Sequence, residues 1–487
     1  MKKFDIITFL VILLIGVISL APYLNPHYSI DCYYDLVGNQ QLYLSSVAGR
    51  PFFGLLLIIF NTLRINIIEN QQIFWFVSLL IFSIGTLILV KKFIRILNLI
   101  DIKKILLLIL ILCGIVYNIF IVEVFQFNTP LLTQAFSFIF ACLAFNLIDE
   151  NINKSKLTKI ILLLITSLFF YQAWIALFVV LSSTLILIRF KEKKKLSIYI
   201  FLAYFISITI NFLYIVVLHP LLWPDIDNTN RMVGINLIGN LLNILSYQKF
   251  LWLHSLNLYP DLIFSAMCLS SMVFMAVFRK YLRLTLNKTV FVYILIIALS
   301  IFLGLFLHLF TKDIWLSQRS TVIIGALPFS LLLVVLLLLK DNASRIVKYL
   351  TVLVVVFLTA QIYYMNVLGN DLLINNKLEQ AEVRNIVKEI ENYEKTDNVI
   401  VKNIYFINDS NPTQSYKGIT QSYDVNVRGL TRSWTLIGIF NFVSDRDFYI
   451  NEMPKQDRDI AFGNVDRTGF DKTNLIFDRD NVYLLIY

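Results

Sequence analysis

Two carboxylates close to the N-terminus have a spacing that could serve catalysis. Asp31 and Asp35 lie four residues apart, so a local helix would place both on one face. A carboxylate in such a position could take the proton of an acceptor hydroxyl as a general base. A solvated loop can carry two acids at the same spacing, so the pattern alone leaves both interpretations open.

Two arginines could bind a phosphate group. Arg50 directly precedes Pro51, and proline suits the first position of a helix, so Arg50 would lie at a helix N-terminus. The helix dipole and a guanidinium group together favour a phosphate. Arg319 precedes the apolar segment 321–339 and could supply a second cation. Either arginine could instead anchor the edge of a membrane segment.

Further polar residues are expected to surround a substrate. Glu123 stands in an apolar stretch, so it is either a second acid of the site or the structural partner of an arginine. Tyr171 and Gln172 interrupt the apolar run 160–188, which is tolerated mainly where a helix faces protein or a water-filled cavity. An interfacial aromatic residue is the alternative for Tyr171. The expected substrate groove comprises Glu123, Tyr171, Gln172, Trp223, Asp225 and Arg231.

No cofactor is predicted from the sequence. The four histidines have no metal-binding spacing, and the positions of the four cysteines do not indicate a set of disulfide bonds. Three Asp-x-Asp pairs in the Asp-rich tail, at 445–447, 457–459 and 478–480, are little more than chance predicts, and a fourth at 225–227 is a weak candidate. The sequence therefore assigns no metal ligands, and a requirement for a divalent metal is left open.

The composition shows which elements must position these residues. The chain has 487 residues, of which 58% are hydrophobic and 15% charged, and its mean hydropathy is +0.73. Soluble domains carry roughly 25% charged residues, so we predict an all-α polytopic membrane protein. The N-terminal apolar run is expected to be an uncleaved first helix. The candidate spans are 6–22, 73–90, 105–122, 131–148, 197–217, 258–278, 290–310, 321–339 and 346–367.

The distribution of basic residues predicts the topology. We interpret 51–63 as too short to cross and 160–188 as a hairpin of two short helices that turns near Tyr171. The segments then assigned to the cytoplasm hold 22 Lys and Arg, against six in the outside segments before the tail. This bias favours about 11 crossings, a cytoplasmic N-terminus and an outside C-terminus. The same bias accounts for the net charge of +10, so no nucleic-acid partner is needed to explain it.

The chain is expected to have two domains. Residues 1–367 would form the membrane domain, with outside loops 23–72 and 218–257, and the apolar stretch from Val233 to Leu245 could lie at the membrane interface. Residues 368–487 are polar and would form a small α/β domain outside the membrane. Helical spacing predicts an amphipathic helix from Glu379 to Glu394. Strands are predicted for Val399–Ile407 and Val482–Tyr487.

Taken in order, these residues resemble one family. An acid after the first helix (Asp31), Gly49-Arg50-Pro51, Tyr171-Gln172 in a broken helix and a late outside Arg319 are similar to the serotype-converting Gtr-type O-antigen glucosyltransferases. The similarity covers about residues 1–370 as architecture. One departure is that family members often carry paired acids after the first helix. In this chain Cys32 follows Asp31 and the next acid is Asp35, so either carboxylate could be the base.

The resemblance implies a GT-C-like membrane glycosyltransferase of the bacterial inner membrane. It implies undecaprenyl phosphate carrying a sugar, usually glucose, as donor and lipopolysaccharide O-antigen as acceptor, with chemistry on the periplasmic side. Arg50 and Arg319 would bind the donor phosphate, and a donor synthase and a flippase would be partners. Another lipid-linked-sugar transferase or an O-antigen polymerase is an alternative. A glycolipid transporter or flippase is disfavoured, because the predicted spans hold almost no ionisable residues.

Overall fold

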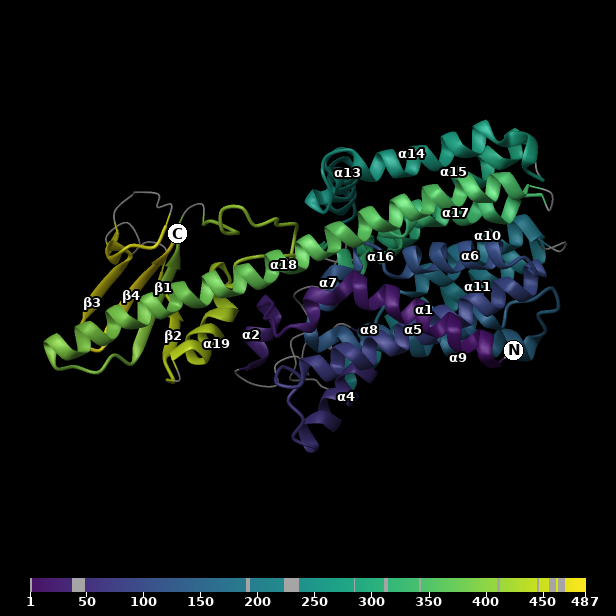
Figure 1. Cartoon of the computed structure of the whole chain (residues 1–487). Helices are drawn as coiled ribbons and strands as arrows, with labels where there is room; N and C mark the ends of the chain where they lie inside the picture. Colours follow the sequence, from purple (N-terminus) through teal and green to yellow (C-terminus); the bar gives the residue numbers. More distant parts are fainter. Residues whose placement is uncertain are drawn as a thin grey trace. The chain divides into compact units, whose positions relative to one another are not determined.

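The computed structural model in Figure 1 describes most of the chain. The described residues are all except 1, 37–48, 190–192, 223–235, 284, 311–313, 341–342, 410–411, 445, 455–460 and 463–468. Contacts divide the chain into two compact units. The first, here called the membrane unit, comprises Met1–Leu24 and Gln41–Val367. The second, the C-terminal unit, comprises Asn25–Gln40 and Leu368–Tyr487.

Helices make up the membrane unit. Within the described ranges, six helical segments are long and apolar enough to cross a membrane: Lys3–Leu24, Gln71–Leu97, Asn128–Asn146, Lys194–Leu221, Asn287–Leu305 and Ser344–Asp397. The helices are α1 (Lys2–Leu20), α4 (Pro51–Thr62), α5 (Gln71–Leu97), α6 (Ile102–Val116), α7 (Ile121–Gln126), α8 (Asn128–Asn146), α9 (Lys154–Phe170), α10 (Ile175–Arg189), α11 (Lys193–Leu213), α12 (His219–Leu222), α13 (Leu237–His254), α14 (Ile263–Val277), α15 (Leu286–Leu305), α16 (Val322–Gly325), α17 (Leu327–Leu338) and α18 (Ser344–Asp397).

The breaks between these helices have local causes. A break is present at the predicted position, because α9 ends at Phe170 and α10 begins at Ile175. The predicted span 105–122 is shorter than expected, since Asn118 donates to the Ile115 carbonyl and accepts from the Phe120 amide, which ends α6. The predicted span 321–339 divides near Ala326, because Pro328 occupies the start of α17. The predicted loop 218–257 is in part a helix, α13.

The boundary between the two units differs from the expected one in two ways. The sequence predicts a break between a span at 346–367 and an amphipathic helix from Glu379, whereas α18 runs without interruption over 54 residues. The unit boundary at Val367 falls inside this helix. In addition, residues 25–40 belong with the C-terminal unit rather than with the membrane unit. α18 contains no proline, and neither Gly369-Asn370 nor the change in polarity ends the helix.

The C-terminal unit is built on a four-stranded sheet. The strands are β1 (Asn403–Asn408), β2 (Tyr449–Glu452), β3 (Leu475–Asp478) and β4 (Asn481–Ile486), in the order β2-β1-β4-β3. β1 is parallel to both β2 and β4, and β3 is antiparallel to β4. The two strands and the amphipathic helix predicted from the sequence are therefore confirmed as β1, β4 and the last part of α18.

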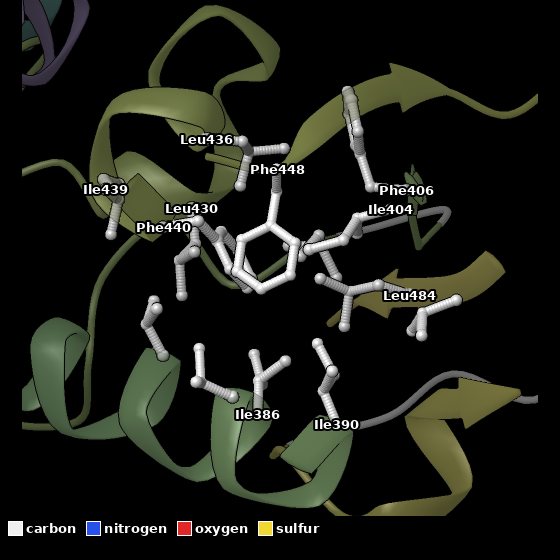
Figure 2. Close-up of a cluster of buried hydrophobic side chains, with 14 of the residues drawn as sticks. Ile386, Ile390, Ile404, Phe406, Leu430, Leu436, Ile439, Phe440, Phe448 and Leu484 are labelled. Atoms are coloured by element: carbon white, nitrogen blue, oxygen red, sulfur yellow. The ribbon is translucent and has the colours of Figure 1, made fainter. Parts of the chain in front are cut away.

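Two helices cover one face of this sheet. Ile386 and Ile390 from α18 pack with Leu436, Ile439 and Phe440 from α19 (Ser433–Ser444) over the strands, and Figure 2 shows this cluster. A short helix, α2 (Ile30–Leu36), packs against α19. A Cβ atom at Gly438 would collide with the Tyr33 carbonyl oxygen. The close approach of α2 and α19 therefore depends on a glycine at position 438.

Candidate functional site

Arg50 is held at the N-terminus of a short helix. Pro51 is the first residue of α4, as the sequence predicts, and Arg50 is its N-cap. The Arg50 Nε donates to Gln172 Oε1 at 2.8 Å. The guanidinium carbon lies 3.9 Å from the ring centroid of Tyr171, within the range of a cation–π contact. The structure thus brings together Arg50, Tyr171 and Gln172, which the sequence proposes separately.

Arg319 is held in a similar way but with an acid beside it. Its guanidinium lies 3.8 Å from the centroid of Phe127. Its Nε is 3.5 Å from Glu123 Oε1, and its backbone N–H donates to Glu123 Oε2 at 2.9 Å. The side chain of Glu123 is fully buried. Of the two roles left open for Glu123, the structure therefore favours structural partner of an arginine over second acid of the site.

The two arginines lie close enough for their charges to interact. Burial lowers the pKa of Arg50, the polar side chain of Tyr171 opposes this, and the positive charge of Arg319 lowers the pKa further. Their supporting residues follow helix ends in the chain, because Tyr171 comes directly after α9 and Glu123 lies in α7, between α6 and α8. In Figure 1, α7, which holds Glu123, lies at the end of the bundle away from the N-terminus.

The electrostatics of this pair favour an anion. Glu123 balances the charge of Arg319, whereas no carboxylate within the described ranges lies at ion-pairing distance from Arg50. Arg50 is only partly buried, so part of the residue remains exposed. Two fixed guanidinium groups in a largely apolar surrounding can bind a phosphate through charge-assisted hydrogen bonds.

The two proposed carboxylates belong to a different part of the chain. Asp31 and Asp35 lie in α2, so the helix required for them to share a face is present. Both side chains are partly buried. This helix is part of the C-terminal unit, whereas Arg50 and Arg319 are part of the membrane unit. The assignment of Asp31 or Asp35 as a base remains a prediction.

Three of the predicted groove residues, Trp223, Asp225 and Arg231, lie outside the described residues. Over the ranges that the structure describes, no group of three or more His, Cys, Asp or Glu side chains could hold a metal ion. The four cysteines are buried and unpaired with one another.

Sequence reasoning missed two sets of polar residues. Asn211 donates to the Gly49 carbonyl next to Arg50, and an asparagine inside an otherwise apolar helix was the available signal. Arg428 is completely buried in the C-terminal unit, where it pairs with Glu382 and lies over the ring of Tyr487. Nothing in the local sequence marks Arg428, because its partners are 46 and 59 residues away.

Comparison with known proteins found no match to a family model, to a curated protein or to a solved structure.

Proposed function

We propose that the chain is a membrane glycosyltransferase that uses a sugar carried on a polyprenyl phosphate. The donor would be undecaprenyl phosphate carrying a hexose, with glucose the first candidate, and the acceptor lipopolysaccharide O-antigen. The reaction would occur on the periplasmic side of the bacterial inner membrane, in a protein with about 11 crossings. The observation that carries the proposal is the pair Arg50 and Arg319, each held against an aromatic ring and near enough for their charges to interact.

The arginines would act on the leaving group. A lipid-linked phosphate lies at the membrane surface while its chain lies in the bilayer, which matches cations at the ends of apolar helices. When the bond between the anomeric carbon and the phosphate oxygen breaks, the phosphate gains negative charge. Arg50 and Arg319 would stabilise that charge without rearranging, since both guanidinium groups are already held against aromatic rings. Glu123 would keep Arg319 oriented.

The acceptor needs a base. In a single displacement, Asp31 or Asp35 takes the proton from the acceptor hydroxyl, and the hydroxyl oxygen attacks the anomeric carbon. The phosphate leaves with the bonding electron pair, and the proton stays on the carboxylate. The reaction inverts the anomeric centre, so a β-linked donor gives an α-linked product. No metal is needed for this proton balance, and dependence on a divalent cation is a separate measurement.

The proposal is tested on the glycan itself. The gene is expressed in an O-antigen-bearing host that supplies the donor synthase and the flippase, and the lipopolysaccharide is analysed by mass spectrometry and linkage analysis. We expect one added hexose per repeat unit. Asp31→Asn, Asp35→Asn and Arg50→Ala are compared, and loss of a general base should reduce transfer by about a hundredfold or more.

Asp261→Asn is the matched control, because Asp261 is an exposed carboxylate whose ion-pair partner within the described residues is His254. Full transfer by both the Asp31 and the Asp35 variants would contradict their role. An unchanged glycan in the presence of donor would favour another acceptor, an O-antigen polymerase or a glycolipid transporter.

A further inference from the structure

The turn that carries Arg50 can be formed only by glycine at the preceding position. Gly49 has φ of +73°, in the left-handed region that other residues avoid. A Cβ atom at Gly49 would lie 2.6 Å from Cδ1 and from Cγ1 of Ile215. Gly49 is therefore required both by its backbone conformation and by the side chain packed against it.

Two amide side chains hold this turn from different helices. Asn211 Nδ2, from α11, donates to the Gly49 carbonyl at 2.7 Å. Gln172 Nε2 donates to the same carbonyl at 3.4 Å, while Gln172 Oε1 accepts from Arg50 Nε at 2.8 Å. Gln172 thus contacts both the backbone before Arg50 and the Arg50 side chain. Asn211 contacts the backbone alone.

The helix that supplies Asn211 changes its geometry directly afterwards. Residues Tyr214–Leu218 form a π-helical turn between α11 and α12, and Ile215 lies in that turn. A π-helical turn is wider than an α-helical one and often occurs at functional sites. It places Ile215 against Gly49 on the same helix that presents Asn211. Asn211 is buried in an apolar helix, where an amide without a partner would be costly.

From this geometry we propose that Asn211 and the π-turn Tyr214–Leu218 are positioning elements for Arg50. They hold the Gly49 carbonyl and the left-handed Gly49 backbone, so the Arg50 guanidinium stays over the Tyr171 ring and remains available for a phosphate. Asn211 itself does not contact the phosphate. The inference deepens the proposed function and rests on Arg50 as a phosphate ligand.

Binding of lipid to the full-length protein in detergent tests the inference without requiring turnover. Native mass spectrometry compares undecaprenyl phosphate with undecaprenol, which has the same chain and no phosphate. The wild-type protein should prefer the phosphate lipid. Arg50→Ala should abolish most of that preference, and Asn211→Ala should reduce it by about fivefold, the effect of losing one buried hydrogen bond. Asn211→Ala should cause no further loss in the Arg50→Ala background, because it acts through Arg50.

Two further variants keep the test decisive. Gly49→Ala disturbs the same turn from the side of Ile215 and should reduce the preference as well. Ser207→Ala is the matched control, because Ser207 is buried in the same helix one turn earlier and bonds to the Ala203 carbonyl. It should leave the preference unchanged.

The outcomes separate this inference from the proposed function. If wild type prefers the phosphate lipid, Arg50→Ala loses the preference and Asn211→Ala keeps it, the positioning role is overturned and the phosphate site stands. An equal loss with Ser207→Ala would also overturn the positioning role, since any buried polar substitution would then suffice. If the wild-type protein shows no preference, the phosphate site and the positioning role both fail.

Discussion

The surroundings of three arginines decide what each can do. Arg50 has an amide and an aromatic ring beside it and remains partly exposed. Arg319 has a similar ring contact and a buried carboxylate, Glu123. Arg428 is fully enclosed, with Glu382 as its ion-pair partner and the Tyr487 carbonyl as a second acceptor. The first two can meet a ligand, whereas Arg428 can only hold its own unit together.

The enclosed pair makes a prediction about stability. Arg428→Ala leaves the carboxylate of Glu382 buried without its ion-pair partner, so the C-terminal unit should lose about 3–5 kcal/mol of unfolding free energy. Arg446→Ala breaks the more exposed pair with Glu394 and should cost about 1 kcal/mol or less. Hydrogen exchange in β1 and β4, followed by mass spectrometry of the full-length protein, measures both. Equal protection in the two variants would contradict the prediction.

At the level of elements, α13 has three distinct faces. Asn240, Tyr247 and Leu251 are buried against the membrane unit. Tyr247 shares a hydrogen bond with Thr321, two residues from Arg319. A second face carries exposed apolar side chains, and a third is polar. The exposed apolar residues are Leu237, Ile238, Leu241, Leu242, Leu245 and Leu253, and the exposed polar ones are Asn243, Ser246, Lys249 and His254. Lys249 lies on the apolar side, where its long stem can reach water from the lipid surface. Figure 1 shows α13 end-on, while α14 and α15 run lengthwise.

These faces are what a helix in the membrane interface needs, with protein, lipid and water on different sides. Spin labels attached to cysteines at Leu241 and Asn243, which point to different sides of the helix, should therefore differ in proteoliposomes. We expect the label at 241 to be relaxed mainly by oxygen, which partitions into lipid, and the label at 243 mainly by a water-soluble nickel complex. Equal access of the nickel complex to both positions would place α13 in water instead.

The elements also show what local sequence can and cannot predict. The break at Tyr171 was predictable, because an apolar run of that length exceeds one span and the polar residue Gln172 interrupts it. The C-terminal strands followed from alternating apolar residues. The π-turn after Asn211 was not, because Gly49, on which its residue Ile215 packs, lies more than 160 residues earlier and leaves no local signal. Likewise the Glu123–Arg319 pair joins segments 196 residues apart.

For the whole molecule, the number and direction of crossings can be measured with cysteines. Among the described residues, six helices are long and apolar enough to span, and the charge distribution predicts about 11 crossings with short helices included. The four native cysteines are all buried, so introduced ones can be labelled against a low background. We expect a membrane-impermeant maleimide added to intact spheroplasts to label cysteine at Glu69 and at Lys417. It should not label cysteine at Lys103 or at Lys195 before the membrane is opened.

Each position decides one feature of the topology. Label at Lys195 in intact spheroplasts would mean that 160–188 crosses once rather than twice. Protection of Glu69 would mean that Pro51–Thr62 crosses, since residue 69 would then face the cytoplasm. Protection of Lys417 would place the C-terminal unit in the cytoplasm rather than outside. That result would contradict the proposal that the reaction with the acceptor occurs on the periplasmic side.

The domain organisation could be predicted only in part. The change from an apolar to a polar composition after residue 367 predicted where the C-terminal unit starts. The reason is that polar groups cannot be left without partners inside a bilayer. The sequence gives no sign that residues 25–40 join that unit. The contact depends on Gly438, which leaves room for the Tyr33 backbone. A contact between segments so far apart in the chain produces no repeating pattern of residues in either segment.

The packing of α2 on α19 has a consequence for how the protein is made. Tyr33 leaves the ribosome early, and Gly438 follows about 400 residues later, which at typical rates of synthesis is a delay of roughly 20–80 s. Throughout that interval the nascent segment 25–40 has no finished partner, while the helices between are inserted. The C-terminal unit can complete its core only when translation is nearly over, so chaperones and membrane insertases would handle a protein whose first loop is among the last to fold.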